Sequence, residues 1–172
     1  VFPKNTVRLP FKLRSSNFPV GIKYIAGSSA QLKSAAILAA LNSYGTTTVL
    51  EKYKTRDHTE NLLTKNSKSI LFKNKKDIIK ISGKKTLDPF NIKIPSDPSS
   101  AAFYSAICLL NKNSRLKIKN VCVNPKRLGF YNILKKNGAQ IRIVNRKKIN
   151  SEYVGDILIK SSKINFLKTN FS

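Results

Sequence analysis

Residues 20–43, VGIKYIAGSSAQLKSAAILAALNS, decide the fold because they place a strand directly before a helix. The stretch 20–25 alternates between apolar and polar residues, which predicts a strand. Ser28-Ser29 offers an N-cap, and Gly45 is expected to stop the helix soon after Ser43. The residues spaced for one helix face, which we expect to lie close against a sheet, are Leu32, Ala35, Ala36, Ala39 and Ala40.

The elements around this segment follow the order β-α-β-α-β-β. A β-branched strand is expected at 46–50. The capping box Asp57-His58-Thr59-Glu60 then opens a short helix. A hairpin of strands at 70–72 and 78–81 closes the series, and a further strand is expected at 7–13, before the quoted segment.

The pattern then restarts. A strand at 91–94 precedes a helix that Asp97 caps and Pro98 opens. Its small-residue face is predicted to hold Ala101, Ala102, Ser105, Ala106 and Leu109. A strand at 116–121, a helix at 128–136 and strands at 141–144 and 157–159 follow. The order β-α-β-α-β-β therefore occurs twice, which predicts layered α/β units built on an internal repeat.

The repeat also suggests a register and a boundary. Ser28-Ser29-Ala30 superposes on Ser99-Ser100-Ala101 at a displacement of 71 residues. Prolines at 89, 95 and 98 mark a hinge at about 90–97. The basic runs at 73–76 and 146–148 lie between apolar stretches and are interpreted as hairpin turns.

The charge is unusual: 33 Lys and Arg against 8 Asp and Glu give +25 over 172 residues. A nucleic-acid-binding module is one interpretation. The excess is +13 in residues 1–86 and +12 in 87–172, however, and Lys outnumbers Arg 26 to 7. An even spread dominated by Lys favours codon bias in an A/T-rich genome over a selected polyanion surface, so nucleic acid is not the expected partner.

Other counts bound the class of protein. A hydrophobic content of 41% is enough for a core, and no run approaches the roughly 20 apolar residues of a membrane span. Cys108 and Cys122 lie in apolar contexts, so we expect buried, reduced thiols and a cytoplasmic location. With one His and no CxxC or HxxxH spacing, we expect no zinc site. The chain contains no Met, not even at position 1, which suggests a partial or processed product.

Two features are suited to anions. The helix start at Ser28-Ser29-Ala30-Gln31 offers free N–H groups to a phosphate or carboxylate, although spacing alone favours serines that merely cap. Arg56 stands at another helix start, where a cation is unfavourable unless an anion binds there. The alternative is a solvated Arg56 paired to Asp57 or Glu60. No P-loop and no carboxylate pair at catalytic spacing occur in the sequence, so no catalytic residue is expected in this segment.

Four motifs resemble the 5-enolpyruvylshikimate-3-phosphate (EPSP) synthase family. They are, in order, S-S-A-Q-L-K-S-A at 28–35, T-R-D-H-T-E at 55–60, D-P-S-S-A-A-F at 97–103 and N-P-K-R-L-G at 124–129. Ser96 and Ser15 depart from the family pattern at positions that are usually Gly. The motifs extend over nearly the whole chain and thereby identify it as a member of the family.

The resemblance implies an enzyme of two domains, each made of three β-α-β-α-β-β units. The two domains would close on substrate at the cleft between them. It implies transfer of the enolpyruvyl group of phosphoenolpyruvate to the 5-hydroxyl of shikimate 3-phosphate, in aromatic amino-acid biosynthesis, with no metal or organic cofactor. By the same resemblance, Ser29, Ala30, Gln31 and Arg56 would bind shikimate 3-phosphate, and Gln31 would also approach phosphoenolpyruvate.

The family's catalytic residues are expected outside this chain, which would then be an internal segment truncated at both ends. Residues 1–91 would be the last part of the first domain and 92–172 the first part of the second. The segment alone is expected to be inactive, and the complete enzyme to be a monomer. The alternative within the same fold is UDP-N-acetylglucosamine enolpyruvyl transferase, which T-R-D-H-T-E argues against; a non-catalytic remnant is another.

Overall fold

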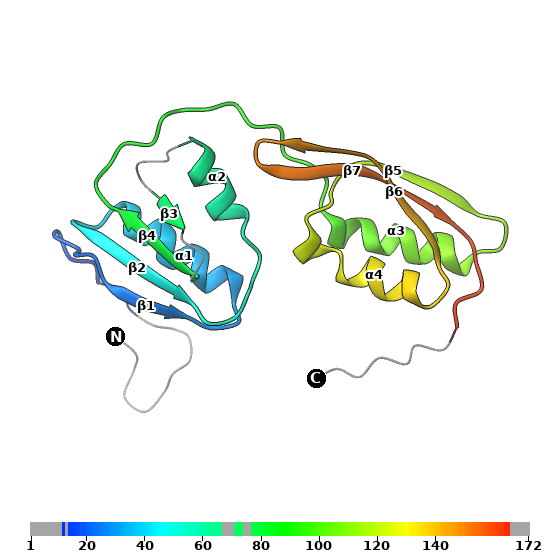
Figure 1. Cartoon of the computed structure of the whole chain (residues 1–172), viewed down its shortest axis with the longest axis horizontal. Helices are drawn as coiled ribbons and strands as arrows, with labels where there is room; N and C mark the ends of the chain where they lie inside the picture. The colour runs from blue at the N-terminus through cyan, green and yellow to red at the C-terminus, as the bar shows by residue number, and fades with distance from the viewer. Residues whose placement is uncertain (1–11, 13, 67–70, 74–76, 166–172) are drawn as a thin grey trace. The chain divides into compact units, whose positions relative to one another are not determined.

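The computed structural model describes residues 12, 14–66, 71–73 and 77–165 (Figure 1). The chain divides into two compact units. The first is made of the described residues of Val1–Lys54 and Ser67–Asp88, and the second of those of Thr55–Asn66 and Pro89–Ser172. The expected strand at 7–13 lies outside the described residues, apart from Lys12.

The first unit is a four-stranded sheet with one helix. Its elements are β1 (Lys23–Ala26), α1 (Ala30–Leu41), β2 (Thr46–Glu51), β3 (Leu71–Lys73) and β4 (Ile78–Ser82). The strand order is β1-β2-β4-β3, with β1 parallel to β2 and the other neighbours antiparallel. Val49 and Ile79 face each other across β2 and β4 and are fully buried, so the core of this unit lies at the middle of the sheet.

The second unit is a three-stranded antiparallel sheet with the order β5-β7-β6. Its elements are α2 (His58–Asn66), α3 (Pro98–Leu110), β5 (Arg115–Cys122), the 3-10 turn η1 (Pro125–Arg127), α4 (Gly129–Lys136), β6 (Gln140–Ile149) and β7 (Glu152–Lys160). Helices α3 and α4 lie side by side on one face of this sheet (Figure 1). The sheet therefore has one face that forms a core.

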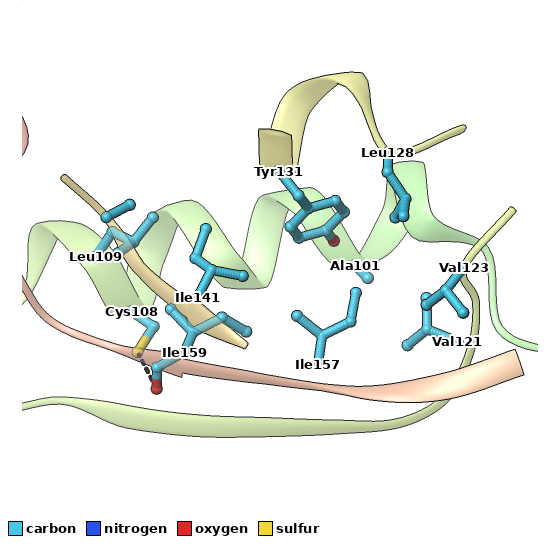
Figure 2. Close-up of a cluster of buried hydrophobic side chains, with 11 residues drawn as sticks. Ala101, Cys108, Leu109, Val121, Val123, Leu128, Tyr131, Ile141, Ile157 and Ile159 are labelled. Carbon is cyan, nitrogen blue, oxygen red and sulfur yellow. Dashed lines mark hydrogen bonds between the residues drawn. The ribbon is translucent and has the colours of Figure 1, made fainter. Parts of the chain in front are cut away.

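The core of the second unit lies between α3, α4 and the sheet (Figure 2). Ile157 and Ile159 of β7 are buried in it, Ile157 near Tyr131 of α4 and Ile159 near Ile141 and Cys108. Its polar atoms are paired, since the Tyr131 hydroxyl donates to the Pro98 carbonyl at 3.1 Å and the Cys108 thiol donates to the Ile159 carbonyl at 3.8 Å. Burying each isoleucine side chain stabilises the unit by about 1.5–3 kcal/mol.

The predicted repeat is confirmed in the topology of the two sheets. The order β2-β4-β3 in the first unit matches β5-β7-β6 in the second. The parallel partner that β1 provides for β2 is reduced in the second unit to one parallel bridge between Ser96 and Val121. The prediction of a strand at 91–94 is therefore wrong. Neighbouring prolines lack the N–H that a ladder needs, and only Ser96 exchanges hydrogen bonds with β5.

The register of the repeat is also corrected. Ser29 caps α1 and Asp97 caps α3, which gives a displacement of 97 − 29 = 68 residues rather than 71. The buried positions agree with 68: Lys33, Ile37 and Ala40 of α1 correspond to Ala101, Ser105 and Cys108 of α3. The Ser-Ser-Ala similarity thus pairs residues that occupy different places in the two helices.

The face predicted for α1 is wrong except at Ala40, which is buried. Leu32 is 58% exposed, and Ala35 and Ala39 are exposed, whereas Lys33 and Ile37 are fully buried. A helix that is apolar on nearly every side has no periodic signal that selects one face. The face predicted for α3 holds at its centre, where Ala101, Ser105 and Leu109 are buried.

The basic run 146–148 does not form a turn, because it belongs to β6. The β6–β7 hairpin turns at Asn150 and Ser151, whose φ angles are 48° and 67°. Positive φ at both central residues is typical of the tight hairpin turn that matches strand twist. The other basic run contains residues 74–76, which lie outside the described residues.

The remaining predicted elements are confirmed, with shifts of a few residues at their ends. The first strand begins at Lys23 rather than Val20, which makes only an isolated bridge with Tyr44. Cys108 and Cys122 are buried and free, as predicted. Among the described residues, no helix combines the length and hydropathy that crossing a membrane requires.

Candidate functional site

The N-terminal end of α1 carries three of the four predicted site residues. Ser29 is the N-cap: its backbone is extended, and its Oγ accepts a hydrogen bond from the Leu32 amide at 3.3 Å. Ala30 is the first residue of the helix, and Gln31 is exposed beside it, with its Oε1 3.4 Å from Ser29 Oγ. The capping interpretation is therefore confirmed. The first-turn amides and the positive end of the helix dipole point to the same exposed place.

A buried ion pair fixes this helix on its sheet. Lys33 Nζ lies 2.8 Å from Glu51 Oε1, and both side chains are completely buried. Glu51 ends β2, so the pair joins the first turn of α1 to the carboxyl end of the neighbouring strand. Because a buried charge is costly without its counter-ion, this pair holds the start of α1 in one position.

Arg56, the fourth predicted residue, belongs to the second unit and immediately precedes Asp57 and α2. Its side chain is half-buried, and in the described part of the chain no hydrogen bond or ion pair engages it. The alternative in which Asp57 pairs with Arg56 is not observed, because the Asp57 carboxylate is bound by Lys126 and Asn124 instead. The guanidinium is therefore available to a ligand.

Asp57, the residue after Arg56, is held by two side chains of the second unit. Lys126 Nζ lies 2.6 Å from Asp57 Oδ2, and Asn124 Nδ2 donates to Asp57 Oδ1 at 3.1 Å. Asn124 and Lys126 come from the N-P-K-R motif, so the second and fourth motifs of the sequence meet here. Asn124 also caps η1 by accepting from the Lys126 amide at 3.0 Å. The position of Arg56 along the chain is thus set by contacts of its neighbour.

His58, the residue after Asp57, is also held by a side-chain contact. His58 Nδ1 lies 2.8 Å from Glu152 Oε1. The same carboxylate accepts from Asn61 at 3.2 Å and from Asn124 at 3.3 Å, and the Cys122 thiol lies 3.9 Å from its Oε2. Glu152, the first residue of β7, is therefore the centre of a polar cluster that connects α2, β5 and β7.

The start of α3 has its own charged pair. Asp97 caps the helix by accepting from the Ser100 amide at 3.0 Å, and its other oxygen is bound by Arg127. Burial alone would raise the pKa of Asp97, but hydrogen bonds from the Ser100 and Ser99 amides outweigh it and lower the pKa. Arg127 also donates to Ser99 Oγ at 3.0 Å. Arg127 of the fourth motif therefore binds two side chains of the third motif, Asp97 and Ser99.

A cavity of about 240 Å³ lies beside these groups in the second unit. His58, Asp97, Arg127 and Glu152 contribute its polar wall, and Ile92 and Ile94 are among its apolar residues. The Lys33–Glu51 pair and the cluster around Glu152 cannot be predicted from sequence pattern alone. The available signal was weak: a Lys inside an apolar helix, and an acid in a chain with only 8 acids.

Comparison with known proteins agrees with these motifs. The family model of EPSP synthase (3-phosphoshikimate 1-carboxyvinyltransferase) matches residues 2–169. A 3-phosphoshikimate 1-carboxyvinyltransferase of Petrotoga mobilis is 45% identical over 137 residues, 80% of this chain and 32% of the relative. One from Novosphingobium aromaticivorans is 38% identical over 90% of this chain and 36% of the relative.

The solved structures lead to the same family. EPSP synthase from Acinetobacter baumannii superposes with a TM-score of 0.70 and 36% identity, over 83% of this chain and 32% of that structure. The chain spans about a third of the length of the relatives it matches. The α/β fold of the enolpyruvyl transferase type is confirmed. The chain belongs to the EPSP synthase (3-phosphoshikimate 1-carboxyvinyltransferase) family.

Proposed function

We propose that this chain is part of an enzyme that transfers the enolpyruvyl group of phosphoenolpyruvate to the 5-hydroxyl of shikimate 3-phosphate and releases phosphate. The observation that carries the proposal is the family match over residues 2–169. All four motifs lie inside the match. The enzyme would act in the shikimate pathway, which supplies aromatic amino acids.

In this proposal the start of α1 binds shikimate 3-phosphate through Ser29, Ala30 and Gln31, and Gln31 also approaches phosphoenolpyruvate. Support comes from the exposed helix end, where the Ser29 hydroxyl and the amides of Ala30 and Gln31 can donate to an anion. The Lys33–Glu51 pair supports the same role by holding the helix start without presenting a competing charge at the surface.

Arg56 is proposed as a second contact to shikimate 3-phosphate. Its half-buried guanidinium makes no ion pair within the described residues, while Asp57 and His58 beside it are held by partners. An arginine fixed through its neighbours rather than by its own side chain is prepared to bind an anion with little additional ordering.

The proposal extends to the organisation of the complete enzyme. Residues 1–91 would belong to its first domain and 92–172 to its second. The enzyme would be a monomer that needs no metal or organic cofactor for the reaction. A cytoplasmic location is supported by two buried free thiols, a state that reducing compartments maintain.

A chimera tests the activity. The matching third of the Petrotoga mobilis relative is replaced by this chain, and phosphate release from phosphoenolpyruvate and shikimate 3-phosphate is measured. We expect turnover in the chimera and none from the 172 residues alone. A chimera that folds but accepts UDP-N-acetylglucosamine in place of shikimate 3-phosphate would refute the assigned substrate. Turnover by the isolated chain would refute the claim that the chain alone is inactive.

Two variants of the chimera test the residues. Arg56→Ala and Gln31→Ala should each weaken shikimate 3-phosphate binding by about 10–100-fold, as expected for a lost hydrogen bond to a charged group. Arg115→Ala, which removes an exposed arginine at the start of β5, is the matched control and should bind normally. Unchanged affinity in both test variants would show that the site lies elsewhere.

A further inference from the structure

The chain has one histidine and two cysteines, and the histidine and one of the cysteines lie together. A ring nitrogen of His58, the sulfur of Cys122 and a carboxylate oxygen of Glu152 all lie within 4.8 Å of one another. Tetrahedral zinc, with bonds of about 2.0–2.3 Å to nitrogen, oxygen and sulfur, places its ligand atoms about 3.3–3.6 Å apart. Small side-chain rotations would bring the three groups to that spacing.

The three groups are placed by element ends rather than by loops. His58 is the first residue of α2, Cys122 the last of β5 and Glu152 the first of β7. Asn61 and Asn124 donate hydrogen bonds to the two oxygens of Glu152 and so orient the carboxylate. Hydrogen bonds of this kind to a ligating carboxylate are typical of metal sites.

The geometry also indicates which atom of His58 would coordinate the ion. Nδ1 is the ring nitrogen that faces Glu152, 2.8 Å from its Oε1, so Nδ1 would be the ligand, whereas the buried Nε2 has no hydrogen-bond partner among the described residues and takes no part in the cluster. All three residues also line the 240 Å³ cavity, which gives a small ion a route and a space for a water molecule.

We infer that His58, Cys122 and Glu152 bind a divalent transition-metal ion, with Zn²⁺ preferred and one coordination position open to the cavity. The donor set selects the class, because imidazole and thiolate suit Zn²⁺, whereas Mg²⁺ and Ca²⁺ require oxygen ligands. The positive charge of the chain opposes cation binding over the whole surface, so an ion bound here would have to be held by the three ligands themselves.

A bound ion would join α2, β5 and β7 two residues from Arg56. The inference does not depend on the proposed function, since it uses only contacts inside the second unit. It differs from the expectation of no zinc site drawn from sequence spacing, because the three ligands are 94 and 30 residues apart in the chain.

Metal titration of the 172-residue chain tests the inference. Zn²⁺ binding is measured by calorimetry in a thiol-free reductant, and Co²⁺ binding by absorption. We expect one ion per chain, a thiolate-to-cobalt charge-transfer band, and no displacement by excess Mg²⁺. Cys122→Ser should abolish the band and weaken Zn²⁺ binding at least about tenfold.

Cys108→Ser is the matched control, because Cys108 is equally buried but lies in the core away from the cluster. It should keep the band and the affinity. No stoichiometric Zn²⁺ complex in the unmodified chain, or equal affinity in the two serine variants, would overturn the inference. If circular dichroism shows that Cys122→Ser does not fold, His58→Gln and Glu152→Gln are measured in its place. Each should weaken Zn²⁺ binding at least about tenfold. Unchanged Zn²⁺ affinity in both variants would overturn the inference.

Discussion

The two repeats hold their first helix against the sheet in different ways. At equivalent positions α1 buries Lys33, paired with Glu51, and α3 buries Ala101. The caps also differ, since an uncharged Ser29 begins α1 and a charged Asp97, bound by Arg127, begins α3. The comparison shows that one topology accepts an ionic or an apolar contact at the same place. It also shows that the helix start proposed to bind an anion is the one without a carboxylate.

The largest expected effect is the loss of stability when a buried isoleucine is replaced in either sheet. It tests whether the two sheets are packed equally tightly. Ile79 on β4 and Ile157 on β7 are completely buried on equivalent central strands. Ile79→Ala and Ile157→Ala should each lower the free energy of unfolding by about 2–5 kcal/mol, since both leave a cavity. Urea unfolding of each variant measures this change in the free energy of unfolding. A much smaller loss for Ile79→Ala would show that the first sheet is not packed like the second.

The next effect tests the ionic contact of α1. Lys33→Ala copies the alanine of α3 but leaves Glu51 buried without its closest cation, so the free energy of unfolding should fall by about 3 kcal/mol. The double variant Lys33→Met/Glu51→Leu should recover most of the loss, because it removes both charges. If Lys33→Ala alone is neutral in urea unfolding, the pair does not fix the helix.

Exchanging the caps gives a smaller effect. Ser29→Ala and Asp97→Ala should each cost about 1 kcal/mol, with the larger loss for Asp97, which also binds Arg127. Ser29→Asp copies the cap of α3 and should keep the stability of α1. In the chimera the same substitution should abolish shikimate 3-phosphate binding by repulsion. Normal binding by Ser29→Asp would separate the cap from the anion site.

The smallest effect concerns Asp156 on the central strand β7. Its carboxylate accepts from Asn145 at 2.9 Å and from the Asn120 amide at 3.0 Å, at the two places where the register of its neighbours shifts. These hydrogen bonds, that of Asn145 first, lower the pKa of Asp156 to about 2.

Since the folded pKa lies below the ordinary value of about 3.9, Asp156 stabilises the fold above that pH, and the contribution is lost as pH falls toward 2. Asp156→Asn should therefore lower the melting temperature at pH 6, and the difference from the unmodified chain should shrink on acidification. Thermal melts by circular dichroism at pH 6, 4 and 2.5 measure this. A difference that does not change with pH would contradict the assignment.

Much of the fold could be predicted from local pattern. Ser29 and Asp97 were identified as caps because a short polar side chain before an apolar run satisfies helix amides within three residues. The strand β2 follows from its β-branched run Thr46–Glu51. The buried face of α1 could not be predicted, because Leu32 and Ile37 look alike in sequence and only the packing decides which is covered.

Apart from the strand expected at 91–94, the sequence by itself determined the order of elements, the existence of the repeat, the two helix caps and, through four motifs, the family. Each of these depends on residues close together in the chain or on a pattern read along it. Only the tertiary structure decided the 68-residue register, the Lys33–Glu51 pair and the meeting of His58, Cys122 and Glu152. These depend on distances between residues that are remote in sequence, and such distances are set by how sheets and helices pack.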